Sequence, residues 1–339
     1  GAANTAIGNS ALGANTTASN NTAVGFSALV SNTTGGTNVA IGSLCLDANT
    51  TGQNNVAAGV HALGANTTAD DNTGIGHNAL KENTTGTQNT AVGSLALDVN
   101  TTGIENTAVG YASLSANTTA NFNTALGRKA LEDNTTGHSN TAAGTDALNQ
   151  NTEGDKNTAV GYQSLTANTT ADNNTSIGYQ ALKANTTGSG NTTMGAVAGL
   201  SVTTGSNNAL FGFGAGDAIT TGANHTAIGA FTLSAVTTVN DLTAIGRSVL
   251  AVNTSGSGNT GVGSNALTAN TAGNENTAVG NISLDANTTG SQNTALGYSA
   301  LSANTTADFN TAIGRQALSV NTTGASNVAV GGNALDANT

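Results

Sequence analysis

Apolar and polar positions recur along the chain with one fixed period. The pentapeptide NTAIG at residues 4–8 returns in register through the chain and reappears as NVAVG at residues 327–331. The consensus reads N-T-A-V-G-x-x-A-L-x-x-N-T-T-G-x-x, and we number its positions as slots 1 to 17. Because a fixed internal period indicates a repeat architecture, we expect one repeat domain over residues 1–339. It consists of twenty coils, the first of which starts at Asn4 and the last at Asn327, with a new coil at every seventeenth position.

Each copy is too short for two helices, and its fixed Gly, Asn and Thr residues are poor helix formers. We therefore predict an all-β fold, a β-solenoid in which each copy is one coil. Two short strands per coil are expected, near slots 1–4 and slots 7–10 or 12–14. Slot 5 is Gly in all twenty copies and predicts a corner. With coils about 4.8 Å apart, the stack would be on the order of 95 Å long.

Two apolar columns are the expected core of the solenoid. Slot 4 is apolar in every coil, beginning with Ile7, and slot 9 is Leu in eighteen coils, beginning with Leu12. We expect both columns to point inward, where stacked aliphatic side chains are removed from contact with water.

Slot 12 carries a different signal. It is Asn in seventeen coils, beginning with Asn15, and the three exceptions fall in consecutive coils as Val202, Ile219 and Val236. A column that changes together from Asn to aliphatic residues is predicted to face inward. There the amides would hydrogen-bond to one another along the stack.

Slots 3 and 4, and again slots 8 and 9, are adjacent apolar pairs. Neighbouring residues of a strand point to opposite faces, so both faces would be covered. A coil has one inside, so the second face would need a partner, and the small Ala at slots 3 and 8 would let another chain approach. The sequence therefore predicts a homo-oligomer.

The composition narrows the classes of function. Charged residues make up 7% of the chain, aromatic residues 3%, proline is absent and the net charge is −11. The seven Lys and Arg residues do not cluster, so we expect no nucleic acid partner. No apolar run of about 18 residues is present, so we expect no membrane insertion. Any export signal or anchor would lie outside this chain.

Titratable residues do not form a recognisable reactive group. The aspartates Asp47, Asp98, Asp285 and Asp336 at slot 10 are at least three coils apart, too far to share a cation, and the four His residues fall in four different slots. The single cysteine, Cys45, takes slot 8, where a small packed residue is expected. We expect no catalytic residue, no cofactor and no metal ion, and hence no enzyme.

Thr occupies slot 13 in all twenty coils, from Thr16 to Thr339. Such an outward column could serve strand packing through cross-strand hydroxyl bonds, carry O-linked sugars or bind ice.

The least regular stretch, residues 191–258, is where a specific binding patch would lie. Phe211, Phe213 and Phe231 gather there, and Gly replaces the slot 9 Leu in two consecutive coils. The alternative is a repacked interior, in which Phe211 at slot 4 and the aliphatic side chains of slot 12 fill the space of the missing leucines.

Repeats such as Asn-Thr-Ala-Val-Gly-Tyr-Gln-Ser-Leu at residues 157–165 resemble the head repeats of trimeric autotransporter adhesins. They are also similar to the N-T-A-I-G-Y-x-A-L repeats of bacterial and phage tail-fibre-type proteins. The resemblance implies a left-handed β-roll that is trimeric and exposed at a cell or virion surface. The coils of adhesin heads are usually shorter than those found here.

The sequence therefore predicts a structural extracellular fibre or filament subunit that forms a stiff rod. Its partner would be itself, in a homotrimer or an end-to-end filament. A second hypothesis is an adhesin or receptor-binding fibre head, in which the variable slots 6, 7, 10, 11, 16 and 17 bind surface glycans or proteins. A third is an ice-binding protein that uses the threonine column.

Overall fold

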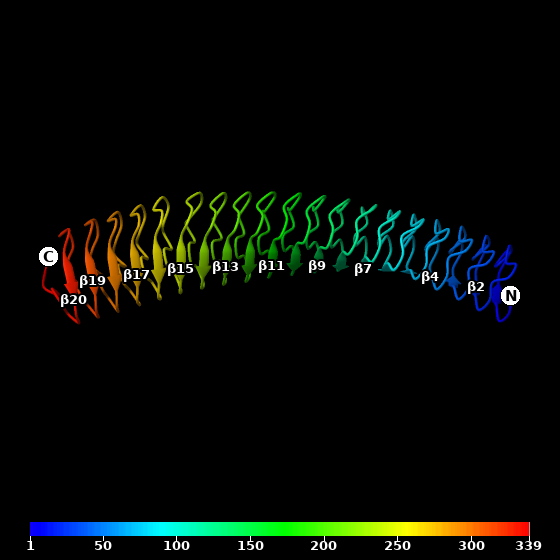
Figure 1. Cartoon of the computed structure of the whole chain (residues 1–339), viewed down its shortest axis with the longest axis horizontal. Coiled ribbons are helices and arrows are strands. Elements are labelled where there is room, and N and C mark those ends of the chain that lie inside the picture. The colour runs from blue at the N-terminus through cyan, green and yellow to red at the C-terminus, as the bar shows by residue number, and fades with distance from the viewer. Residues whose placement is uncertain (339) are drawn as a thin grey trace. The chain divides into compact units, whose positions relative to one another are not determined.

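The structure is a computed structural model that describes residues 1–338; Thr339, the last threonine of slot 13, lies outside the described residues. The chain divides into two compact units, residues 1–172 and residues 173 onward, which are described separately. In each unit the coils stack side by side, with one strand in each coil (Figure 1). Residues 1–338 contain no helix that could span a membrane. A single repeat domain stays a prediction.

Ten strands belong to each unit, and every strand has three residues. In the first unit they are β1 (Thr5–Ile7), β2 (Thr22–Val24), β3 (Val39–Ile41), β4 (Val56–Ala58), β5 (Thr73–Ile75), β6 (Thr90–Val92), β7 (Thr107–Val109), β8 (Thr124–Leu126), β9 (Thr141–Ala143) and β10 (Thr158–Val160). In the second unit they are β11 (Thr175–Ile177), β12 (Thr192–Met194), β13 (Ala209–Phe211), β14 (Thr226–Ile228), β15 (Thr243–Ile245), β16 (Thr260–Val262), β17 (Thr277–Val279), β18 (Thr294–Leu296), β19 (Thr311–Ile313) and β20 (Val328–Val330).

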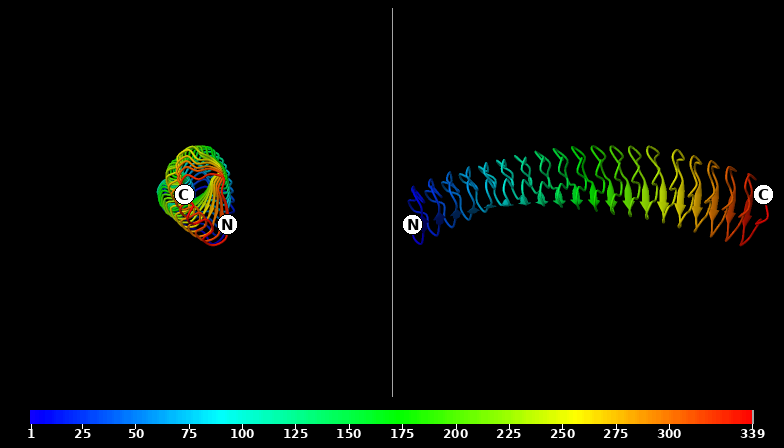
Figure 2. Two further views of the ribbon diagram at one scale, coloured as in Figure 1. Left: turned by 90° about the vertical axis from the view of Figure 1, so that its left-hand side faces the viewer. Right: turned by 180° about the vertical axis from the view of Figure 1, so that it is seen from behind.

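Within each unit, consecutive strands pair in parallel and in register. In the pair β2–β3, Thr22 lies opposite Val39 and Ala23 opposite Ala40, an offset of one full repeat. The same offset holds for the other pairs inside each unit, and Figure 2 shows the strands following one another along the stack. The prediction of an all-β solenoid with one repeat in each coil is confirmed, and its strands are parallel.

The prediction of two strands per coil is wrong. The one strand occupies slots 2–4, and the chain then passes through successive turns over slots 6–11. In the second coil Ser27 at slot 7 and Leu29 at slot 9 have φ values of 53° and 52°, in the left-handed region. The amide of Asn32 donates to the carbonyl oxygen of Leu29 at 3.2 Å, which closes a turn. Because left-handed residues interrupt extended backbone, no second strand can form there.

Glycine at slot 5 marks the corner where each strand ends. Gly25 has a φ of 141°, which L-residues rarely adopt, and a Cβ atom on it would lie 2.3 Å from the carbonyl oxygen of Gly42 in the next coil. Both the dihedral angle and the close stacking of coils therefore require glycine at this slot.

The core is lined by slots 3, 8 and 9. In the second coil Ala23, Ala28 and Leu29 are fully buried, and the columns above them follow the same pattern. Slots 8 and 9 both point inward because the turn replaces the alternation of a strand. The expectation that these neighbours lie on opposite faces is therefore wrong, and neither slot needs a partner chain to be covered.

Slot 4 is not part of the core, which corrects the second apolar column. Ile7 is 61% exposed in the first coil, and Ile41 inside the stack is 47% exposed. Slot 3 points inward, so slot 4, its neighbour on the strand, points outward. We call the side chains of slots 2 and 4 the outer sheet face. Leu12 of slot 9, by contrast, is buried.

Buried asparagines connect the coils at slot 12. The side-chain amide of Asn49 donates to Oδ1 of Asn32 at 2.9 Å. The amide of Asn32 donates to the carbonyl of Gly35, which also accepts a hydrogen bond from Asn21 at slot 1. The slot 15 carbonyl thus joins two asparagine columns inside one coil. Asn15, in the first coil, is half-buried.

The aliphatic block in slot 12 takes the same inward position. Val202, Ile219 and Val236 are fully buried. Packed methyl groups therefore replace the hydrogen-bonded amides in three coils of the second unit.

The space of the two missing leucines is filled, but not by Phe211. A Cβ atom on Gly199 would lie 2.9 Å from Cδ1 of Leu210. One on Gly216 would lie 2.7 Å from Cδ1 of Ile219 and 3.0 Å from Cδ2 of Leu210, so an aliphatic side chain of slot 12 fills part of this space, as predicted. Leu210 takes slot 3, where most coils have Ala, and it is fully buried. Phe211 follows it on β13 and belongs to the outer sheet face, so the prediction that it repacks the interior is wrong.

Candidate ligand-binding groove

Side chains of slots 6, 7, 10 and 11 form a line of hollows along the turns of the first unit, which we call the turn groove. Three hollows have volumes of about 450, 310 and 220 Å³. The largest is lined by Leu95, Asp98, Val99, Tyr111, Ala112, Ser115, Ala116, Glu132 and Asp133. The second is lined by Arg128, Lys129, Glu132, Asp146, Asn149, Gln163 and Thr166. The third is lined by Asp47, His61, Gly64, Ala65, Lys81 and Glu82.

The turns explain why these four slots make a groove. Slots 8 and 9 turn inward between them, so slots 6 and 7 and slots 10 and 11 stand at either side of a depression. Slots 6, 7 and 10 vary from coil to coil and slot 11 is often Ala, whereas the core slots repeat. The groove therefore offers a different set of side chains at each level of the stack.

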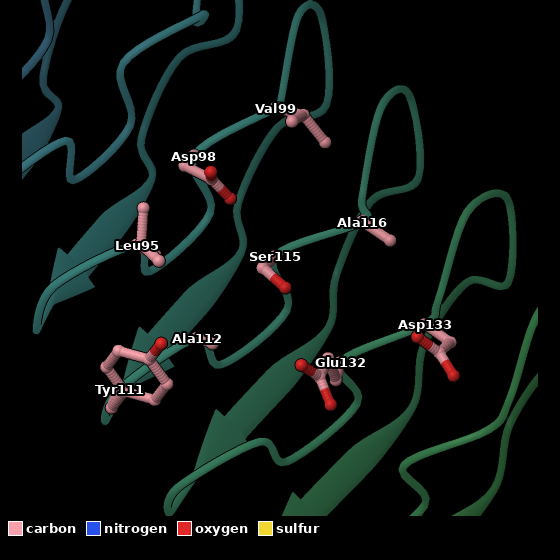
Figure 3. Close-up of a pocket in the computed structure, with 9 residues that line it drawn as sticks. All are labelled: Leu95, Asp98, Val99, Tyr111, Ala112, Ser115, Ala116, Glu132 and Asp133. Atoms are coloured by element: carbon pink, nitrogen blue, oxygen red, sulfur yellow. The ribbon is translucent and has the colours of Figure 1, made fainter.

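The largest hollow, which we call the Tyr111 hollow, combines an aromatic ring with aliphatic walls (Figure 3). The Tyr111 side chain is 50% exposed although its coil is packed on both sides. The apolar part of the lining consists of Leu95, Val99, Ala112 and Ala116. Such a mixture of apolar walls and a few polar groups is typical of small-molecule sites.

The polar part of the hollow contains a partly buried carboxylate, Asp98. Oδ1 of Asp98 is buried and has no hydrogen-bond partner. Burial raises the pKa of Asp98. A hydrogen bond from its own backbone amide and the nearby Lys81 lower the pKa in part, and Glu82 raises it further. Burial and the charge of Glu132 also raise the pKa of Asp133. A ligand that donates hydrogen bonds to these oxygens would restore part of their lost hydration.

Glu132 is already engaged by protein groups. Its carboxylate accepts from Nζ of Lys129 at 2.9 and 3.1 Å and from the side-chain amide of Asn149 at 2.9 Å. Among residues 1–338, no side chain donates a hydrogen bond to the other two carboxylates of the hollow, Asp98 and Asp133.

The pair of Tyr111 and Asp98 has a counterpart in the second unit. Asp285 and Tyr298 take the same two slots, again in consecutive coils. Oδ1 of Asp285 is buried without a partner, and burial raises the pKa of this carboxyl as well. Tyr298 is 47% exposed.

Other parts of the two neighbourhoods agree only in part. Ser115 corresponds to Ser302, whereas Glu132 and Asp133 correspond to Ser319 and Val320. What the two sites share is one ring, one carboxylate, one hydroxyl and small or aliphatic walls. The sequence contains this signal as a matching pair of slots, but only the turn geometry shows that those slots face one depression.

The predicted phenylalanine patch is brought together only in part. The rings of Phe213 and Phe231 meet edge to face, with centroids 5.3 Å apart and an angle of 78° between planes. Both rings are about half exposed. Phe211 does not join them, since it takes slot 4 on the outer sheet face.

The threonines of slot 13 use their hydroxyl groups within the stack. Oγ1 of Thr33 donates to the carbonyl oxygen of Thr50 at 3.0 Å, and the next hydroxyl repeats the pattern with Thr67. Each bond links neighbouring coils. O-glycosylation and ice binding by this column stay predictions.

Among residues 1–338, no three His, Cys, Asp or Glu side chains lie close enough to hold a metal ion together. Cys45 is fully buried, and this burial raises the pKa of its thiol to about 12. The thiol is therefore protonated at neutral pH and is a packing group.

Comparison with known protein families and with curated proteins finds no match for this chain.

Proposed function

We propose that this protein is a structural subunit of an extracellular fibre or filament at a cell or virion surface, with no catalytic role. The observation that supports the proposal is the continuity of hydrogen bonding from coil to coil. Within each unit the strands pair at every level, and the asparagine and threonine side chains add a bond at most levels. A stack with short connections and few unpaired backbone groups resists unfolding and proteolysis. The resemblance to adhesin heads favours a left-handed coil.

Copies of the chain associate through the outer sheet face in this proposal. Slots 2 and 4 contain no charged residue in any coil, and slot 4 is aliphatic, Met or Phe throughout. Many of these side chains are more than a third exposed, for example Ile75, Val109 and Ile228. A charge-free apolar column of this extent is typical of an interaction surface. Its one-coil spacing fits another copy of the same solenoid, and we propose a homotrimer.

An adhesin or receptor-binding fibre head is a second candidate function. The turn groove supports it, because its side chains come from slots 6, 7, 10 and 11, which vary from coil to coil. The groove and the outer sheet face use different slots, so one chain could both assemble and bind.

Light scattering of the purified chain tests the structural proposal. We expect a mass of three chains or a multiple of three, because trimers that join end to end form filaments. Val109→Lys on the outer sheet face should weaken assembly because a charge cannot be buried unpaired. Thr119→Lys, at the exposed slot 14 of the same coil, is the matched control and should leave the mass unchanged. A monomer at micromolar concentration would refute association through this face.

Electron microscopy separates the two candidate functions. Long filaments of uniform width would support a structural polymer. Discrete particles would favour a fibre head and direct attention to the turn groove.

A further inference from the structure

The turn groove contains one place where the lining selects a class of ligand. The Tyr111 hollow measures about 450 Å³, which is within the range of about 300–1,000 Å³ for small-molecule sites. It is lined by Tyr111, aliphatic side chains and oxygen atoms, with no Lys, Arg or His among the lining residues. Its ligand must therefore have both an apolar face and hydrogen-bond donors.

We propose that the Tyr111 hollow binds a neutral saccharide unit. The ring of Tyr111 presents a face with negative charge density, which attracts the weakly positive C–H groups on one face of a sugar ring. The carboxylate of Asp98, which lines the hollow, accepts a hydrogen bond from a sugar hydroxyl, and the hydroxyl of Ser115 adds a group that both donates and accepts. This inference deepens the adhesin candidate and is independent of fibre assembly.

The carboxylates exclude an anionic ligand. Asp98, Glu132 and Asp133 all line the hollow, and the charge of Glu132 already raises the pKa of Asp133. A phosphate, a sulfate or an acidic sugar would add another negative charge to groups that burial has partly desolvated. A hydroxyl donor gains a charge-assisted hydrogen bond without that repulsion.

The second unit argues for a sugar over a cationic group. A cation would be held mainly by the number of carboxylates, yet two of the three are replaced by Ser319 and Val320 in the corresponding place. The features present in both units are the ring, one partly buried carboxylate and one serine hydroxyl. These are the groups that a polyhydroxylated ring uses. We therefore assign an equivalent site to Tyr298, with Asp285 as its acceptor.

The test uses the full chain on an array of neutral oligosaccharides that includes maltose, cellobiose, lactose and N,N′-diacetylchitobiose. The best binder is then titrated by calorimetry, and ligand-observed NMR reports its contact with tyrosine protons. We expect two sites per chain. Tyr111→Ala and Tyr298→Ala should each remove one of them, and the double variant should remove both.

Asp98→Ala should weaken the site beside Tyr111 by about tenfold or more, because a hydrogen bond to a charged group is lost. Tyr179→Ala is the matched control. Tyr179 takes the same slot 6 and is 54% exposed, but the preceding coil has Thr166 at slot 10 instead of an acid. This control should bind as the unmodified chain does. Circular dichroism verifies that all variants keep the fold.

Three results would overturn the proposal. The first is no response to any neutral glycan at millimolar concentration. The second is equal loss of binding in Tyr179→Ala. The third is salt-sensitive binding of oligolysine at Tyr111, absent at Tyr298, without any glycan binding, because a cationic group would then be the ligand. Light scattering of the same variants keeps this outcome distinct from a failure of fibre assembly, since none of the changes lies on the outer sheet face.

Discussion

Leu210 occupies the space that Gly199 leaves empty: a Cβ atom on Gly199 would lie 2.9 Å from Cδ1 of Leu210. Slot 9 has Leu in all coils except the two with Gly199 and Gly216, and slot 3 has the large Leu210 at the same level of the stack. At this level the large side chain is therefore at slot 3 and not at slot 9, and the interior stays filled. Gly199 has a φ of 59°, close to that of slot 9 leucines, so space and not backbone geometry excludes a leucine there.

This exchange predicts a strong coupling between the two positions. Leu210→Ala should lower the free energy of unfolding by about 2–5 kcal/mol, because it leaves a cavity. Gly199→Leu alone should lower it by about 1–3 kcal/mol, because the interior becomes overpacked. The double variant should be more stable than the sum of the two losses implies, as measured by urea denaturation in a double-mutant cycle. Additive losses would show that the two side chains do not share this space.

Because the asparagines of slot 12 hydrogen-bond to one another, replacing one of them should lower the stability of the fold. The side chain of Asn117 donates to Asn100 at 2.8 Å and to the carbonyl of Ala120 at 3.1 Å, and it accepts from Asn134 at 3.2 Å. Asn117→Val should leave buried partners unsatisfied, at about 1–3 kcal/mol for each group.

Replacing Asn100, Asn117 and Asn134 together by Val provides the comparison. Only the two asparagines that flank this block lose a partner in the column. The methyl groups inside the block pack against one another, as those of Val202 and Ile219 do in the second unit. We expect thermal unfolding to show that the triple variant loses less than three times the stability lost by Asn117→Val. A loss proportional to the number of substitutions would contradict the cooperative column.

Repetition made much of the fold predictable from the sequence. A fixed period gives the number and register of the coils, and glycine at slot 5 is required by both its φ and the close approach of the next coil. The inward direction of slot 12 followed from Val202, Ile219 and Val236, because substitution of a whole column reveals the environment that its members share.

The prediction that slot 4 is buried was wrong because apolar residues were assumed to face the core. The slot 4 residues look like core residues, but they point outward because slot 3 beside them points inward, as buried Ala40 beside exposed Ile41 shows. The left-handed conformation of Leu29 was also invisible, since leucine rarely adopts it. Without that turn the sequence could not show that slots 6, 7, 10 and 11 border one groove, although it identified them as variable.

Asp217 should destabilise the second unit at neutral pH. Burial raises the pKa of its carboxyl above the ordinary value of 3.8, and hydrogen bonds from backbone groups oppose this only in part. The charged form is thus less favourable in the folded chain than in the unfolded one. The penalty is complete above the folded pKa and fades as the pH falls through that pKa toward 3.8.

Asp217→Asn should therefore raise the melting temperature at pH 7, with a gain that shrinks at acidic pH. Glu275→Gln, at an exposed position of the same unit, is the control and should have little effect. The melting temperatures of the three proteins across an acidic pH series provide the measurement. A lower melting temperature for Asp217→Asn at pH 7 would contradict the argument.

His225 should make the second unit sensitive to mild acid. It replaces asparagine at slot 1 and is almost fully buried. Its Nδ1 accepts a hydrogen bond from the amide of Leu242 at 3.3 Å, so the folded chain holds the neutral ring. Burial lowers the pKa of His225 below its ordinary value of 6.5, although the carbonyl of Val239 and the charge of Asp241 raise it in part.

A His whose pKa is lowered by folding binds its proton more readily in the unfolded chain. Its contribution to stability is therefore complete above about pH 6.5 and is lost as the pH falls from there toward the folded pKa. A proton on Nδ1 would also meet the amide hydrogen of Leu242. We expect hydrogen exchange of amides in the coils around His225 to accelerate over this window, ahead of amides in the first unit.

His225→Asn is the matched variant, since it restores the residue found at slot 1 in the preceding coil, Asn208, and in every other coil except the one with Leu242. Its Oδ1 can accept from Leu242, as Oδ1 of Asn208 accepts from the amide of His225 at 3.0 Å. The variant has no titrating group at this position, so exchange in these coils should become independent of this transition while the other three histidines remain. Acid sensitivity that persists unchanged in His225→Asn would place its origin elsewhere in the stack.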